Sequence, residues 1–249
     1  MNQKKKKFNP FLDLRKEENL FESQEKILEA KALKFIKNSD WISAENIYRQ
    51  LVKNNSNNYI VYANLAAVLQ KRNITSDVEL LLKRAIYLNP EFGAAYSNLG
   101  CFYHSQKQFK EAIKFYNKAL NISPKHPEAN FSIGNAYRDI GDMDNAISYL
   151  KKAVLYKDDY YDAHLSLSKI QIKKGKIIES LTHLKKIVEA KNISPNLVLN
   201  AGQVYLELEL FDDAISLFSD LIKKNSYQLE AKIELIAAKK QICCWDNYE

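Results

Sequence analysis

The sequence predicts an all-α protein, built as a solenoid of stacked helix hairpins. Three observations support this fold class: an internal period of 34 residues, apolar residues at helical spacing within each period, and a scarcity of residues that interrupt helices. Only 6 of the 249 residues are Gly and 5 are Pro, while 46% are apolar. Regular structure with a large core is therefore expected to dominate the chain.

The N-terminal segment, residues 1–24, precedes the periodic region. It begins "MNQKKKKFNPF", a basic run with no apolar stretch after it, so it is not a secretory signal. We expect a basic, loosely ordered arm. A solvated tail is the simpler interpretation, and contact of the lysines with an acidic surface or a membrane is the alternative.

The period is clearest in the third unit. Tyr96, Leu99 and Tyr103 recur at helical spacing with Gly100 beside them, which predicts one apolar helix face. A second run of apolar residues follows in the same unit, from Ala112 to Leu120, and predicts the second helix of a hairpin. The register holds without insertion and gives six units: 25–58, 59–92, 93–126, 127–160, 161–194 and 195–228.

These spacings resemble the tetratricopeptide repeat, with Tyr96 at the place where that repeat usually has Trp. The resemblance implies a right-handed superhelix of helix hairpins with a concave inner surface. A single hairpin cannot bury its apolar face, so neighbouring units are expected to stack.

Small residues recur at two places of each unit, where two helix axes are expected to approach closely. Gly141 and Gly175 are predicted to lie in turns between paired helices. Pro90, Pro124, Pro127 and Pro195 are predicted to mark unit boundaries. The eighth place holds Ala32, Ala66, Gly100, Gly134, Ser168 and Gly202, and the twentieth holds Ala44, Ala112, Ala146, Ser180 and Ala214.

The unit 161–194 matches the pattern least well. His164, Ser168, Gln171 and Ser180 replace residues that are expected to be apolar or small. The unit is either a soft point in the array or a divergent repeat.

The inner surface of the array is the predicted binding site. Asn64, Asn98 and Asn200 stand at the sixth place of their units, and an amide can donate to and accept from a peptide backbone at once. This row resembles the asparagine ladder of O-linked N-acetylglucosamine transferases, although Ser132 and Ser166 interrupt it. The alternative is that these side chains support a neighbouring turn. The full predicted set is Asn64, Asn98, Ser132, Asn135, Arg138, Ser166, Lys169 and Asn200.

Residues 229–249 are predicted to form a capping helix with a polar outer face, followed by a Cys-x-Trp tail. The end of the chain, "KKQICCWDNYE", resembles the junction of glycosyltransferase family 41 through Cys243, Trp245, Tyr248 and Glu249. The resemblance implies a longer parent protein that uses a UDP-sugar, whose catalytic half is missing from this chain.

Composition and motifs exclude several other classes. The net charge is +7, but acidic and basic residues interleave outside the N-terminal arm, so no nucleic acid partner is expected. No apolar run reaches the roughly 18 residues of a membrane span. Three cysteines favour a reducing, cytoplasmic location over a disulfide framework. The four histidines are scattered without metal-ligand spacing, and we predict no metal, no cofactor and no catalytic residue.

Three functional hypotheses follow. The first is a non-catalytic scaffold that holds an extended peptide or a partner protein in the concave groove. The second is the acceptor-recognition module of a protein glycosyltransferase. The third is self-association through exposed repeat ends.

Overall fold

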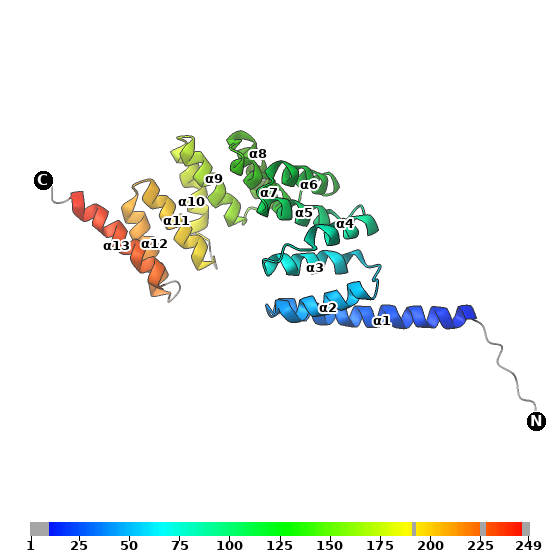
Figure 1. Cartoon of the computed structure of the whole chain (residues 1–249). Helices are drawn as coiled ribbons and strands as arrows, with labels where there is room; N and C mark the ends of the chain where they lie inside the picture. The colour runs from blue at the N-terminus through cyan, green and yellow to red at the C-terminus, as the bar shows by residue number, and fades with distance from the viewer. Residues whose placement is uncertain (1–9, 191–192, 225–227, 246–249) are drawn as a thin grey trace, which may run out of the picture. The chain divides into compact units, whose positions relative to one another are not determined.

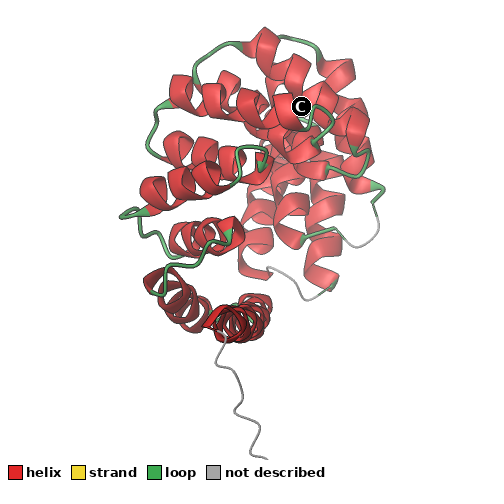
Figure 2. Ribbon diagram, turned by 90° about the vertical axis from the view of Figure 1, so that its right-hand side faces the viewer, coloured by secondary structure: helices red, strands yellow, loops and turns green. Residues whose placement is uncertain are grey.

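The structure is a computed structural model that describes residues 10–190, 193–224 and 228–245. Within these ranges every regular element is a helix (Figures 1 and 2). The helices are α1 (Pro10–Lys37), α2 (Trp41–Lys53), α3 (Tyr59–Lys71), α4 (Val78–Leu88), α5 (Gly93–Ser105), α6 (Phe109–Ile122), α7 (Pro127–Asp139), α8 (Met143–Tyr156), α9 (Tyr161–Lys173), α10 (Ile177–Val188), α11 (Pro195–Glu207), α12 (Phe211–Lys223) and α13 (Gln228–Trp245).

The predicted fold class is confirmed: the chain is an all-α array of helix hairpins. Each of the six predicted units contains one pair of helices, and these units are called repeats 1 to 6 from here on. The chain divides into two compact parts, an N-terminal half (Met1–Ile122) and a C-terminal half (Ser123–Glu249), each described by itself. Among the described helices, none is long and apolar enough to span a membrane.

The turn inside each hairpin has the same backbone geometry in all six repeats. The fifteenth residue has a positive φ, which is +89° for Gly141 and +71° for Gly175, as expected for glycines in a left-handed conformation. The next residue donates its N–H to the carbonyl five positions earlier, for example Asp142 to Tyr137 at 2.9 Å. This pattern is the Schellman motif, which ends the first helix and redirects the chain. The other fifteenth residues are Ser39, Asn73, Lys107 and Glu209.

The paired helices touch through the predicted small residues. Gly134 lies against Leu150, and a Cβ added to the glycine would lie 2.6 Å from Leu150 Cγ. The same construction at Gly202 would place a Cβ 2.4 Å from Phe218 Cε1. A large side chain from the second helix therefore occupies the space that a side chain at the eighth place would need.

The first helix extends further than the repeat pattern predicts. Residues 10–24 were expected to belong to a loosely ordered arm, but α1 begins at Pro10. Proline is well suited to the first helical position, and Leu and Glu, which favour helix, recur in the segment that follows. Residues 1–9, which include the run of lysines, lie outside the described residues.

In the N-terminal half a buried carboxylate connects repeats 1 and 2. Glu45 is 7% exposed, accepts a hydrogen bond from Arg49 Nε at 2.8 Å and pairs with Arg72. Burial alone would raise the pKa of Glu45, but the hydrogen bonds from Arg49 and Arg72 outweigh burial and hold that pKa below its usual value. Because Arg72 follows α3, this pair ties α2 to the next hairpin.

Repeat 5 has an unusually polar interior, at the residues where its sequence departs from the pattern. Ser168 and Ser180 are both fully buried, and their hydroxyl oxygens are 2.7 Å apart. Each serine replaces a small apolar residue, and in their mutual hydrogen bond one hydroxyl donates and the other accepts. The two substitutions are thus a matched pair across the hairpin.

We expect this matching to show in a double-mutant cycle. Ser168→Ala or Ser180→Ala alone leaves a buried hydroxyl without its partner and should lower the free energy of unfolding by about 1–3 kcal/mol. The double variant should be close to wild type, because repeat 1 has Ala32 and Ala44 at the same places, both fully buried. Urea unfolding of the four proteins measures the coupling. Additive losses in the double variant would contradict the prediction.

The last helix, α13, exposes polar residues such as Glu230 and Lys239 on its outer face, and it exposes apolar residues as well. Ala231 is fully buried and Leu235 is partly buried, whereas Leu229, Ile233 and Ile236 are 69%, 59% and 55% exposed. The helix therefore carries apolar residues on its free face as well as on its packed face. Cys243 and Trp245 fall in its last turn, and Tyr248 and Glu249 lie outside the described residues.

Candidate functional site

The predicted binding residues of the N-terminal half lie on first helices. Asn64 is on α3 and Asn98 is on α5, and both side chains are half-buried. The Asn64 amide donates to the hydroxyl of Tyr48 in repeat 1 at 3.1 Å. The main-chain carbonyl of Asn98 accepts a long hydrogen bond from Gln70 Nε2 at 3.5 Å. Asn64 therefore joins repeats 1 and 2 by a hydrogen bond within the protein. This contact is closer to the alternative prediction, in which these side chains support neighbouring structure, than to peptide binding.

In the C-terminal half one contact joins two members of the predicted set. Ser166 on α9 donates its hydroxyl proton to Asn135 Oδ1 on α7, with the two oxygens 3.5 Å apart. Ser166 is only 8% exposed, whereas Asn135 and the neighbouring Ser132 are half-buried. Among the described residues this is the only hydrogen bond within the predicted set.

The two cationic members of the set differ in their surroundings. Arg138 is held by the adjacent Asp139, with Nε–Oδ1 at 2.9 Å and Nη2–Oδ1 at 2.8 Å. A ligand carboxylate would have to compete with Asp139 for this guanidinium. Lys169, half-buried on α9, stands at the ninth place of its repeat, the place that Asn135 has in repeat 4.

One residue on this surface is missing from the predicted set. Gln203 is the ninth residue of repeat 6, three positions after Asn200 on α11. Its amide donates to Glu234 Oε1 on α13 at 2.8 Å. The sequence could have predicted Gln203 as a member of the set, because Asn135 and Lys169 stand at the same ninth place of their repeats.

The predicted row is divided between the two halves of the chain. Asn64 and Asn98 belong to the N-terminal half, and the other members belong to the C-terminal half. The geometry therefore supports two local polar surfaces on first helices, and every predicted residue in them except the buried Ser166 is half-buried. The interrupted row of Asn64, Asn98 and Asn200 as a single peptide-binding ladder stays a prediction.

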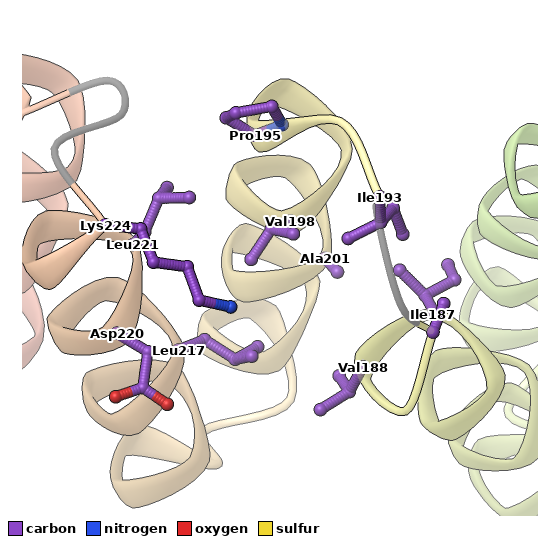
Figure 3. Close-up of a pocket in the computed structure, with 11 residues that line it drawn as sticks. Ile187, Val188, Ile193, Pro195, Val198, Ala201, Leu217, Asp220, Leu221 and Lys224 are labelled. Carbon is purple, nitrogen blue, oxygen red and sulfur yellow. The ribbon is translucent and has the colours of Figure 1, made fainter.

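The C-terminal half also contains a hollow of 630 Å³ that none of the predicted residues lines (Figure 3). It is mainly apolar, and Figure 3 shows Asp220 and Lys224 on the α12 side, with Val198 and Ala201 across from them on α11. The lining residues are Ile187, Val188, Ala190, Ile193, Pro195, Val198, Ala201, Leu217, Asp220, Leu221 and Lys224.

Two histidines that looked unrelated in the sequence meet inside repeat 5. His164 Nδ1 on α9 and His183 Nδ1 on α10 are 2.8 Å apart. His164 Nε2 is 2.9 Å from the main-chain oxygen of Asp158. Their spacing of 19 residues follows neither helical nor metal-ligand periodicity, so no sequence pattern predicts this pair. In the described part of the chain, no group of three or more His, Cys, Asp or Glu is arranged to hold a metal ion.

Comparison with known families identifies two of the repeats. Models of the tetratricopeptide repeat match residues 93–126 and residues 127–160, which are repeats 3 and 4 with their predicted boundaries. A sequence search of curated proteins found no match.

Solved structures of similar fold include those of PilW, YrrB and MamA. PilW, described as a widely conserved type IV pilus biogenesis factor, has a TM-score of 0.72 and 18% identity, covering 85% of this chain and 98% of its own. YrrB, described as a TPR protein with an unusual peptide-binding site, has a TM-score of 0.54 and 21% identity, covering 78% and 97%. MamA has a TM-score of 0.56 and 23% identity, covering 64% and 92%.

Because these structures share at most 23% sequence identity with this chain, the likeness shows the fold alone. It agrees with an all-α array of tetratricopeptide-like hairpins. The resemblance to glycosyltransferase family 41 is not supported by the matched models or by these structures.

Proposed function

We propose that this chain is a non-catalytic scaffold that binds an extended peptide or a partner protein through the first-helix surfaces of its repeats. The observation that supports this most directly is the polar surface of the C-terminal half. There Asn135, Lys169 and Asn200 come from three successive first helices, and all three side chains remain partly accessible. Amide and ammonium groups in such a row suit main-chain carbonyls and carboxylates of a peptide.

The YrrB structure gives this proposal a precedent of the same fold, because its description names a peptide-binding site. No chemistry beyond binding is needed to account for these residues. The groups concerned are hydrogen-bond donors and acceptors, and most are unsuited to act as nucleophile or general base.

The proposal predicts a loss of affinity when the row is truncated. A triple variant with Asn98→Ala, Asn135→Ala and Asn200→Ala should bind its best ligand from a synthetic peptide library at least about tenfold more weakly, since each lost hydrogen bond is worth about 1 kcal/mol. Asn64 is left intact because it supports Tyr48. Isothermal titration calorimetry measures the affinities.

The matched control removes asparagines from a second helix. Asn117→Ala and Asn121→Ala on α6 alter the same residue type away from the first-helix surfaces. Circular dichroism should show the same helix content in all proteins. Equal affinity of the triple variant and wild type would refute the assignment of the row.

A further inference from the structure

The buried histidine pair of repeat 5 has a hydrogen-bond geometry that fixes where its protons lie. The carbonyl oxygen of Asp158 only accepts, so His164 Nε2, 2.9 Å away, carries a proton. A neutral His164 then has a lone pair on Nδ1. The contact of 2.8 Å between the two Nδ1 atoms requires one donor and one acceptor, so His183 Nδ1 carries the proton that His164 accepts.

This chain of hydrogen bonds limits the charge that the closed hairpin can hold. One added proton can be placed on the outer nitrogen of His183, and the contact survives. A second proton has to go to His164 Nδ1, which would turn two N–H groups toward each other at 2.8 Å. The doubly protonated pair is therefore incompatible with the packing of α9 against α10.

The surroundings also oppose protonation. His164 is 4% exposed. Burial, followed by the charges of His164 and Lys151, lowers the pKa of His183 to about 4. Burial also lowers the pKa of His164, although the hydrogen bond to the Asp158 carbonyl and the Asp158 carboxylate act in the opposite direction.

The charged groups on the helices that pack against the histidine pair do not offset this effect of burial. Lys151 faces the pair from α8 and Lys186 faces it from α10, and the one nearby carboxylate, Asp158, already bonds Lys186 at 2.9 Å. From α7 and α11, the other helices in contact with α9, no described ionisable group acts on either ring. The pair thus sits in a site with an excess of positive charge.

We propose that His164 and His183 form an acid-sensitive latch, which holds the α9–α10 hairpin closed when the rings are neutral and opens it when both are protonated. In the unfolded hairpin both rings titrate near pH 6.5. The open state therefore binds more protons than the closed state below that pH, and the closed state loses stability as the pH falls from about 6.5 toward 4.

Opening the latch would also alter the candidate binding surface. Ser166 and Lys169 lie on α9 within two turns of His164, and Ser166 is bonded to Asn135 on α7. The latch rests on the contact between His164 and His183 and on the Asp158 carbonyl at the end of repeat 4, and it does not depend on the proposed function.

Hydrogen exchange of the full chain between pH 7.5 and pH 5 tests the latch, with rates corrected for the intrinsic effect of pH. In wild type, protection of residues 161–188 should fall by about tenfold per pH unit for each proton that the closed state excludes. The α7–α8 hairpin should keep its protection. The comparison protein combines His164→Val with His183→Leu, which copies Val198 and Leu217 from the same places of repeat 6.

The double variant should keep its protection across the same pH range, which would support the latch. An equal fall in both proteins would overturn it. Should the double variant fail to fold, NMR titration of the wild-type imidazoles decides: a second protonation of the pair below pH 6.5 supports the latch, and a second protonation at or above pH 6.5 refutes it.

Discussion

Phe218→Ala is expected to lower the free energy of unfolding by about 3–5 kcal/mol, the typical cost of emptying a buried aromatic site. Phe218 is fully buried on α12, and its ring lies directly against Gly202 on α11. Because the neighbouring helix carries no side chain there, nothing nearby can fill the space that the ring leaves. Urea unfolding followed by circular dichroism measures the loss.

Phe218→Leu is the matched control for this site. Repeats 2, 4 and 5 have Leu82, Leu150 and Leu184 at the same place, all fully buried. The leucine variant should therefore lose much less than the alanine variant, about 1.5 kcal/mol or less. Equal losses in the two variants would show that ring volume is not what stabilises this contact.

Gly134→Val tests the same contact from the opposite side and should destabilise the protein by about 3 kcal/mol, the upper end of the usual cost of overpacking. Its Cβ would lie 2.6 Å from Leu150 Cγ and 3.2 Å from the Ala146 carbonyl oxygen. Leu150 is itself fully buried and has no free space to move into. The gain from replacing a helical glycine, at most about 1 kcal/mol, is smaller than this cost.

Gly93→Val provides the comparison, since the nearest atom to a Cβ at Gly93 is Ile122 Cγ2 at 3.6 Å, an ordinary contact. Its unfolding free energy should change by less than about 1 kcal/mol. Thermal and urea unfolding would be recorded for both variants. A Gly134→Val protein as stable as wild type would mean that the hairpin can widen without cost.

Much of the fold was predictable because its determinants lie close together in the sequence. Glycines at the fifteenth place of repeats 4 and 5 predicted turns, and Gly141 and Gly175 do adopt positive φ there. Pro127 and Pro195 predicted unit boundaries, where a helix stops or starts, and they begin α7 and α11. These residues act through their own backbone preferences, which depend little on the rest of the molecule.

The candidate site was less predictable. The sequence located Asn135 and Ser166 on first helices, but it did not predict that they would bond each other. It also predicted a peptide contact for Asn64, whose amide is bonded to Tyr48 in the structure. The position of a residue within the 34-residue repeat predicts the helix face on which its side chain lies. The hydrogen-bond partners of that side chain depend on the residues of the neighbouring repeat.

The sequence by itself determined the hairpin array, because a 34-residue period with small residues at the helix contact encodes both helix length and close approach. Only the tertiary structure decided which side chains meet across the helices. Leu150 fills the space at Gly134, Ser168 meets Ser180, and His164 meets His183. Each of these pairs is set by the distance and rotation between two packed helices, quantities that no local pattern of residues specifies.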